Sequence, residues 1–77
     1  MHKQALLVFG QVIRNIRQDK HISQEDLADK CGLHRTYISD IELGKRNVSF
    51  ENMIKISHAL NTKLSDIIRE VENNESL

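Results

Sequence analysis

Apolar side chains recur at intervals of three and four residues along most of the chain, which is the spacing of one helix face. The first such stretch spans about residues 5–19, and its inner face holds Leu6, Phe9, Ile13 and Ile16. Four more stretches follow, at about 24–31, 35–43, 50–60 and 64–72. The pattern therefore predicts an all-α chain of five short helices.

Residues that favour helix boundaries stand between these stretches. Ser23 and Ser49 each precede a helix and are expected to act as N-caps. Gly32, Gly44 and Asn61 each follow a helix, where a left-handed residue is expected to end it. The connections are short, so consecutive helices should pack against each other.

The last two helices are rich in large apolar side chains. The face of the fourth helix is predicted to hold Phe50, Met53, Ile54, Ser57 and Leu60, and that of the fifth Leu64, Ile67, Ile68 and Val71. A chain of 77 residues forms one domain and has a small core. Four large aliphatic residues in a nine-residue helix exceed what that core uses, which favours pairing with a second copy.

Composition argues against several classes of protein. The single cysteine, Cys31, excludes an intramolecular disulfide and a multi-cysteine zinc site, and the four histidines lack metal-ligand spacing. Asp40 and Glu42 are two residues apart and point to different sides of a helix, so they do not form a catalytic pair. No cofactor and no enzyme activity are therefore expected, and Cys31 is interpreted as a small buried hydrophobe rather than a redox switch.

No apolar run approaches the length of a membrane span, and residues 1–4 are too short and polar to lead a signal peptide. We therefore expect a cytoplasmic protein. Its formal net charge is zero, from 11 Lys and Arg against 11 Asp and Glu. Residues 1–48 carry 8 − 6 = +2, and residues 49–77 carry 3 − 5 = −2. The first two thirds of the chain thus hold a small basic surplus.

The span 24–43 has the pattern of a helix-turn-helix, although an ordinary helical hairpin shares much of it. Two short helices flank Gly32, which permits the positive φ that a sharp reversal needs. Ala28 is small enough for the two helices to approach closely. The expected inward positions are Leu27, Cys31, Leu33, Ile38 and Ile41.

The second helix of such a unit lies in the DNA major groove, and its N-terminal residues meet base edges. Here it opens with His34, Arg35, Thr36 and Tyr37. Arginine can bond bidentately to guanine, and the threonine methyl can pack on thymine. The tyrosine hydroxyl can reach a phosphate, as can Gln24 at the start of the preceding helix.

The segment SQEDLADKCGLHRTYISDIELGKRNVSFENMIKISHAL resembles the Cro and phage-repressor type of helix-turn-helix domain, the Xre family. Residues 6–72 fit its five-helix layout. Within that family, LHRTYISDIELGKRNVSFENMIKI is most similar to the controller proteins of bacterial restriction-modification systems. The resemblance implies a homodimer that binds a pseudo-palindromic operator in double-stranded DNA, as one dimer or as two dimers on adjacent sites. Such a dimer would recruit or block RNA polymerase.

The resemblance also implies residue roles. Positions that match base contacts are Arg35, Thr36 and Arg46. Positions that match backbone contacts or their support are Gln24, Tyr37, Ser39 and Asn47, and Lys45 adds a cation in the same loop. Arg17 and Glu42 match a partly buried salt bridge. Positions that match a surface shared between core and dimer interface are Phe50, Ile54, Leu64, Ile67, Ile68 and Val71.

The chain departs from the family pattern at three places. His21 stands where glycine is common, so it either adopts the left-handed conformation or the turn differs. Lys63 stands where a capping Ser or Asp would begin the fifth helix. His34 replaces a capping residue, which makes it a further candidate for DNA contact.

Two other functions remain open beside the controller. A stand-alone repressor shares the same core motif. An antitoxin-type DNA-binding module would have a protein partner, but only residues 73–77, which we expect to fray, are left to bind one.

Overall fold

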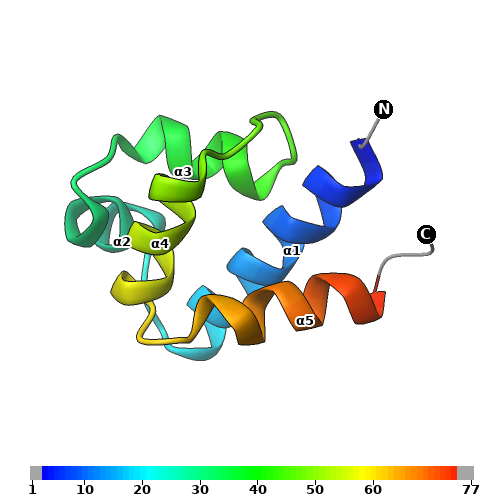
Figure 1. Cartoon of the computed structure of the whole chain (residues 1–77). Helices are drawn as coiled ribbons and strands as arrows, with labels where there is room; N and C mark the ends of the chain where they lie inside the picture. The colour runs from blue at the N-terminus through cyan, green and yellow to red at the C-terminus, as the bar shows by residue number, and fades with distance from the viewer. Residues whose placement is uncertain (1–2, 75–77) are drawn as a thin grey trace.

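The computed structural model describes residues 3–74 as five helices. They are α1 (Lys3–Asp19), α2 (Gln24–Cys31), α3 (Arg35–Glu42), α4 (Phe50–Ala59) and α5 (Leu64–Asn74). α1 packs against α3 and α5, α2 against α3 and α4, and α4 against α5 (Figure 1). No strand occurs in this part of the chain, which confirms the all-α prediction.

The helix boundaries follow local side-chain chemistry. The hydroxyls of Ser23 and Ser49 accept hydrogen bonds from the backbone N–H three residues on, so both predicted N-caps are confirmed. The three predicted left-handed residues, Gly32, Gly44 and Asn61, have φ values of 68°, 75° and 50°. The short connections therefore turn where the sequence predicts.

His21 is also left-handed, with φ 58°. Of the two alternatives for this turn, the left-handed residue is correct, at a cost of about 1–2 kcal/mol relative to glycine.

The end of α5 differs from the prediction. The helix continues to Asn74, whose side-chain amide donates to the carbonyl of Glu70 at 2.7 Å and closes the last turn. The rest of the segment predicted to fray, residues 75–77, lies outside the described residues.

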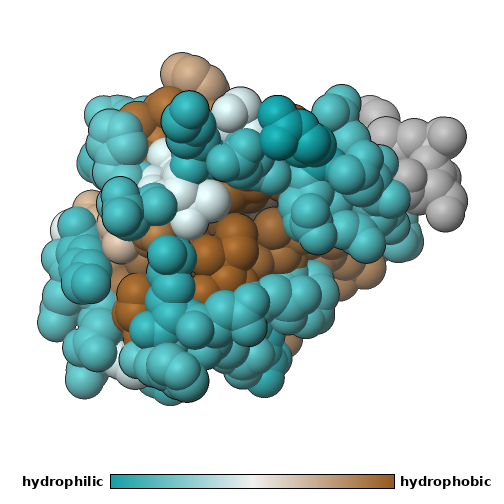
Figure 2. All heavy atoms as spheres, turned by 90° about the horizontal axis from the view of Figure 1, so that it is seen from below, coloured by the Kyte–Doolittle hydropathy of each residue, from teal (hydrophilic) through white to brown (hydrophobic). Residues whose placement is uncertain are grey.

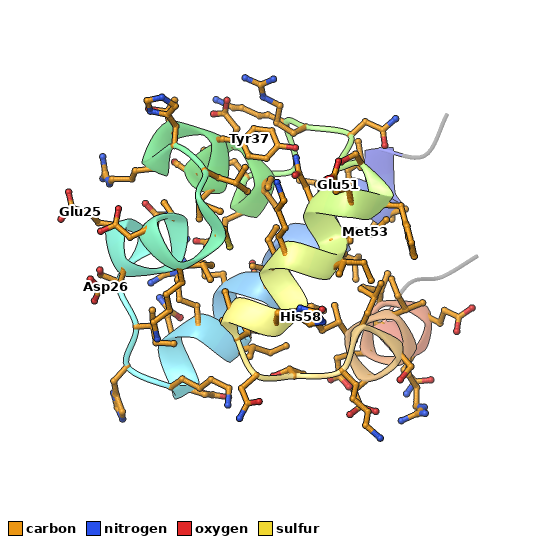
Figure 3. All side chains as sticks on the ribbon, turned by 60° about the vertical axis from the view of Figure 1, so that its left-hand side comes forward. Glu25, Asp26, Tyr37, Glu51, Met53 and His58 are labelled. Atoms are coloured by element: carbon orange, nitrogen blue, oxygen red, sulfur yellow. The ribbon has the colours of Figure 1, made fainter. Side chains whose placement is uncertain are left out.

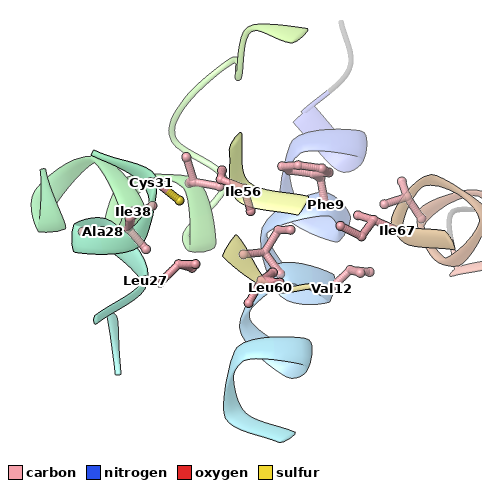
Figure 4. Close-up of a cluster of buried hydrophobic side chains, with 12 residues drawn as sticks. Phe9, Val12, Leu27, Ala28, Cys31, Ile38, Ile56, Leu60 and Ile67 are labelled. Atoms are coloured by element: carbon pink, nitrogen blue, oxygen red, sulfur yellow. The ribbon is translucent and has the colours of Figure 1, made fainter. Parts of the chain in front are cut away.

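A single core fills the space between the helices (Figure 4). Its fully buried large side chains are Ile13, Leu27, Ile38, Ile41, Ile56, Leu60 and Ile67. Two features of α4 were not predicted. Ile56, outside the predicted stripe, is fully buried, whereas Phe50 is 68% exposed because it occupies the first position of α4, beyond the core.

Candidate nucleic-acid interface

α2 and α3 form the predicted helix-turn-helix. Gly32 ends α2, and its N–H donates to Asp29 while the next N–H, of Leu33, donates to Ala28. Ala28 is 2% exposed at the contact between the helices. A glycine in the left-handed region and a small residue at the crossing thus set the steep angle between the two helices.

α3 divides into an inner and an outer side. Ile38 and Ile41 lie in the core, while His34, Arg35 and Thr36 are exposed in the first turn. His34 makes no side-chain capping hydrogen bond, so its ring is not engaged with the helix that it precedes. The residues predicted to meet base edges are therefore available to solvent at one end of the helix.

Arg46 lies beside this first turn, although it is nine residues further along the chain than Tyr37. Its guanidinium carbon is 5.2 Å from the centroid of the Tyr37 ring, a cation–π distance. A hollow in the surface is lined by His34, Thr36, Tyr37 and Arg46, together with Asn52 of α4. The fold thus brings together four residues that the sequence predicts as DNA contacts.

Arg35 borders a different hollow, which it shares with Glu25 and Asp29 of α2. Ser39 is half-buried, and Lys45 and Asn47 are exposed in the loop between α3 and α4. The predicted contacts therefore span the first turn of α3 and the loop that follows this helix.

The predicted salt bridge between Arg17 and Glu42 is present. Arg17 Nε lies 2.7 Å from Glu42 Oε2 and Nη2 lies 3.0 Å from Oε1, so the pair is bidentate. Gln24 Nε2 donates to the same carboxylate at 3.0 Å. Gln24, predicted as a phosphate contact, thus has a structural partner that the sequence did not reveal, and its contact with DNA stays a prediction.

Two functional neighbours were not predicted. Asp40 Oδ2 lies 3.4 Å from Arg46 Nε, and Asn52 Nδ2 donates to the Tyr37 hydroxyl at 3.0 Å. Tyr37 lies next to the first turn of α4 (Figure 3). A carboxylate six residues before an arginine has no helical spacing to mark it, and Asn52 reaches Tyr37 only because α4 folds back beside α3.

A second candidate surface lies on α4 and α5. Ile54, Leu64 and Ile68 are each partly exposed, and Phe50 is exposed nearby on α4. From below, the side on which α5 lies, hydrophobic side chains form a strip between hydrophilic flanks (Figure 2). Ile67 and Val71, predicted to be shared between core and interface, lie in the core. They are 1% and 9% exposed within one protomer, because their side of α5 faces the core.

The described residues, 3–74, contain no group of three His, Cys, Asp or Glu that could hold a metal ion. None of their helices is long and apolar enough to cross a membrane. Cys31 is buried against α4, and burial raises the pKa of its thiol, an effect that the charge of Lys55 opposes.

An exposed arginine and threonine at the start of the second helix of a helix-turn-helix are typical of a DNA-binding protein. Comparison with known proteins agrees. The profile of the helix-turn-helix family matches residues 13–67, so the chain belongs to this family.

More particularly, the chain is similar to the control proteins of restriction-modification systems. It is 57% identical to control protein C.BamHI of Bacillus amyloliquefaciens over 63 residues, which are 80% of this chain and 78% of that protein. It is 45% identical to control protein C.MunI of a Mycoplasma species, over 83% of this chain and 88% of that protein.

A crystal structure gives the same result. The restriction-modification controller protein C.AhdI from Aeromonas hydrophila superposes with a TM-score of 0.79 at 42% identity, covering 80% of this chain and 94% of that chain. The chain is thus a helix-turn-helix DNA-binding regulator of the restriction-modification controller type, and not an enzyme.

Proposed function

We propose that the chain binds a pseudo-palindromic operator as a homodimer and regulates transcription from the adjacent promoter. The observation that carries this proposal is the exposure of Arg35 and Thr36 in the first turn of the recognition helix, where Thr36 shares a hollow with Arg46. Arg35 and Arg46 would contact guanine, and Thr36 a thymine methyl. Tyr37, Ser39, Lys45 and Asn47, with Gln24, would hold the DNA backbone.

The dimer would form through the apolar surface of Phe50, Ile54, Leu64 and Ile68. Two copies related by a twofold axis would place their recognition helices about 34 Å apart, in successive turns of the major groove. The operator would then consist of two half-sites with that spacing. Bound next to a promoter in the cytoplasm, the dimer would recruit or block RNA polymerase.

The experiment begins with selection of a duplex from a random pool by the wild-type chain, followed by footprinting. Arg35→Ala and Thr36→Ala should each weaken binding to the selected duplex by about 1–3 kcal/mol and relax the base preference at one position per half-site. Arg69→Ala, which removes a cation from α5, is the matched control and should leave the preference unchanged. Unchanged affinity and preference in both α3 variants would contradict the proposal.

The controller role has a separate test in the genome. A methyltransferase or endonuclease gene next to the gene for this chain, with the selected operator upstream, would support it. An operator found only upstream of unrelated genes would favour a stand-alone repressor.

A further inference from the structure

Asp40 is a partly exposed carboxylate that contacts Arg46, a predicted base-reading side chain. It lies in α3, three residues after Tyr37, and its side chain is 27% exposed. Exposed ion pairs contribute little to folding stability. An acidic group on a surface that must approach phosphates therefore calls for an explanation other than stability.

The contact between Asp40 and Arg46 uses one particular nitrogen. Asp40 Oδ2 lies 3.4 Å from Arg46 Nε, and within residues 3–74 neither Nη group of Arg46 donates a hydrogen bond. The Arg46 side chain is 52% exposed, so both Nη groups can meet a partner from solution. Bidentate recognition of an acceptor pair such as guanine N7 and O6 needs two such donors.

Two further contacts restrict Arg46. The Tyr37 ring lies 5.2 Å below the guanidinium carbon, and the Tyr37 hydroxyl is itself held by Asn52. The loop that carries Arg46 is also anchored at Asp40, because the Lys45 N–H donates to the Asp40 carbonyl at 2.9 Å. Asp40 thus constrains both the backbone and the side chain of the loop that carries Arg46.

We propose that Asp40 is a positioning residue that orients Arg46 for bidentate contact with guanine, while its negative charge lowers affinity for all other DNA. This inference rests on the proposed base contact of Arg46. The 3.4 Å contact is long for an ion pair, so little interaction energy is lost when the guanidinium shifts toward a base.

Two variants distinguish the orienting effect of Asp40 on Arg46 from the effect of its negative charge. Asp40→Asn removes the charge but keeps an oxygen that can accept from Arg46 Nε. Asp40→Ala removes the charge and the acceptor, and alanine is well tolerated inside a helix. Both variants should bind unselected duplex more tightly than wild type, by about two- to fivefold, because nonspecific binding follows net charge at the interface.

Affinity for the selected operator should differ between the two variants. Ordering one long side chain is worth about two- to tenfold in affinity, so Asp40→Ala should bind the operator that much more weakly than Asp40→Asn. Replacing the guanine opposite Arg46 by 7-deazaguanine, which lacks N7, should remove this difference. Asp66→Asn, the partner of exposed Arg69 on α5, is a charge-matched control and should leave both affinities nearly unchanged.

The Arg46→Ala background separates the inference from the proposed function. If Arg46→Ala alone leaves operator affinity and preference unchanged, the proposed base contact is wrong. If Arg46→Ala weakens operator binding but Asp40→Ala and Asp40→Asn bind the operator equally in the presence of Arg46, the positioning role of Asp40 is wrong. We expect Asp40→Ala and Asp40→Asn to bind the operator equally when Arg46 is replaced by alanine, and unequally when Arg46 is present.

Discussion

Arg17 and Glu42 form a bidentate ion pair that joins α1 to the last residue of the recognition helix α3. The side chains are 10% and 1% exposed, so both charges are removed from water. Arg17 Nη1 also donates to the carbonyl of Ile22 at 2.8 Å, and Gln24 donates to Glu42. One carboxylate and one guanidinium thereby connect α1, the following loop, α2 and α3, and hold the recognition helix at a defined angle.

Removal of one member of this pair should be costly, because the other charge would stay buried without its partner. Glu42→Gln or Arg17→Met should lower the free energy of unfolding by about 3–5 kcal/mol, measured by urea denaturation. Asp66→Asn, which breaks the exposed pair with Arg69, is the control and should cost less than about 1 kcal/mol. Equal losses in the buried and exposed pairs would show that Glu42 is not the linking group described above.

Gly10 permits the close approach of α1 and α3. A Cβ atom at this position would lie 2.2 Å from the carbonyl oxygen of Ile41 and 2.8 Å from that of Glu42. Gly10→Ala should therefore destabilise the fold by about 1–3 kcal/mol or more, although alanine normally favours a helix by about 1 kcal/mol.

Gly32→Ala separates steric overlap from backbone strain. Nothing lies within 4 Å of a Cβ at Gly32, where only the positive φ of 68° opposes alanine. This variant should lose about 1–2 kcal/mol. Thermal unfolding measures the stability lost in each variant. A Gly10→Ala protein as stable as wild type would refute the close approach of α1 and α3 at Gly10.

The sequence predicts the five helices well because local rules decide their ends. Ser23, Ser49 and Gly32 act through their immediate neighbours in the chain. Tertiary relationships carry no such signal. Gly10 is an ordinary helical glycine until α3 crosses it, and no spacing marks Asp40 as the partner of Arg46.

The inner face of α4 shows a second limit of prediction from the sequence. Its first turn follows the same helical stripe as the core residues, but periodicity does not tell where the neighbouring helices stop. Phe50 is consequently exposed, and Ile56 is fully buried although the stripe omits it. Ile67 and Val71 match a surface shared between core and interface only by resemblance, and the sequence alone does not show which side of α5 meets α1.

The apolar surface of α4 and α5 should form the dimer. Ile68→Glu would place a charge in that interface and should convert the protein to a monomer, measured by sedimentation equilibrium. Leu7→Glu is the matched control, since Leu7 is 50% exposed on α1 and lies outside this surface. A dimer that survives Ile68→Glu and dissociates with Leu7→Glu would relocate the interface to α1.

Cys31 should make stability depend on pH in the alkaline range. Burial raises the pKa of its thiol, so above about pH 8.5 the unfolded chain loses this proton while the folded chain retains it. The folded state then binds more protons, and its stability falls as pH rises. The stability difference between wild type and Cys31→Ala, measured by denaturation from neutral to alkaline pH, should shrink, and a difference that grows would contradict the burial.

Operator binding should depend only moderately on salt, because few cations face the DNA. Arg35, Lys45 and Arg46 are exposed on that side of each protomer. If each of these three cations displaces about one counterion from the DNA, whether it contacts a base or a phosphate, the slope of log K against log salt should be about −5 for the dimer. Fluorescence anisotropy across a salt series measures this slope.

Lys45→Ala should reduce the magnitude of the salt slope by about 2 per dimer, whereas Lys63→Ala, which removes a cation from the loop before α5, should not change it. A slope that corresponds to about ten phosphates per protomer would mean that the DNA contacts extend well beyond α3 and its loop.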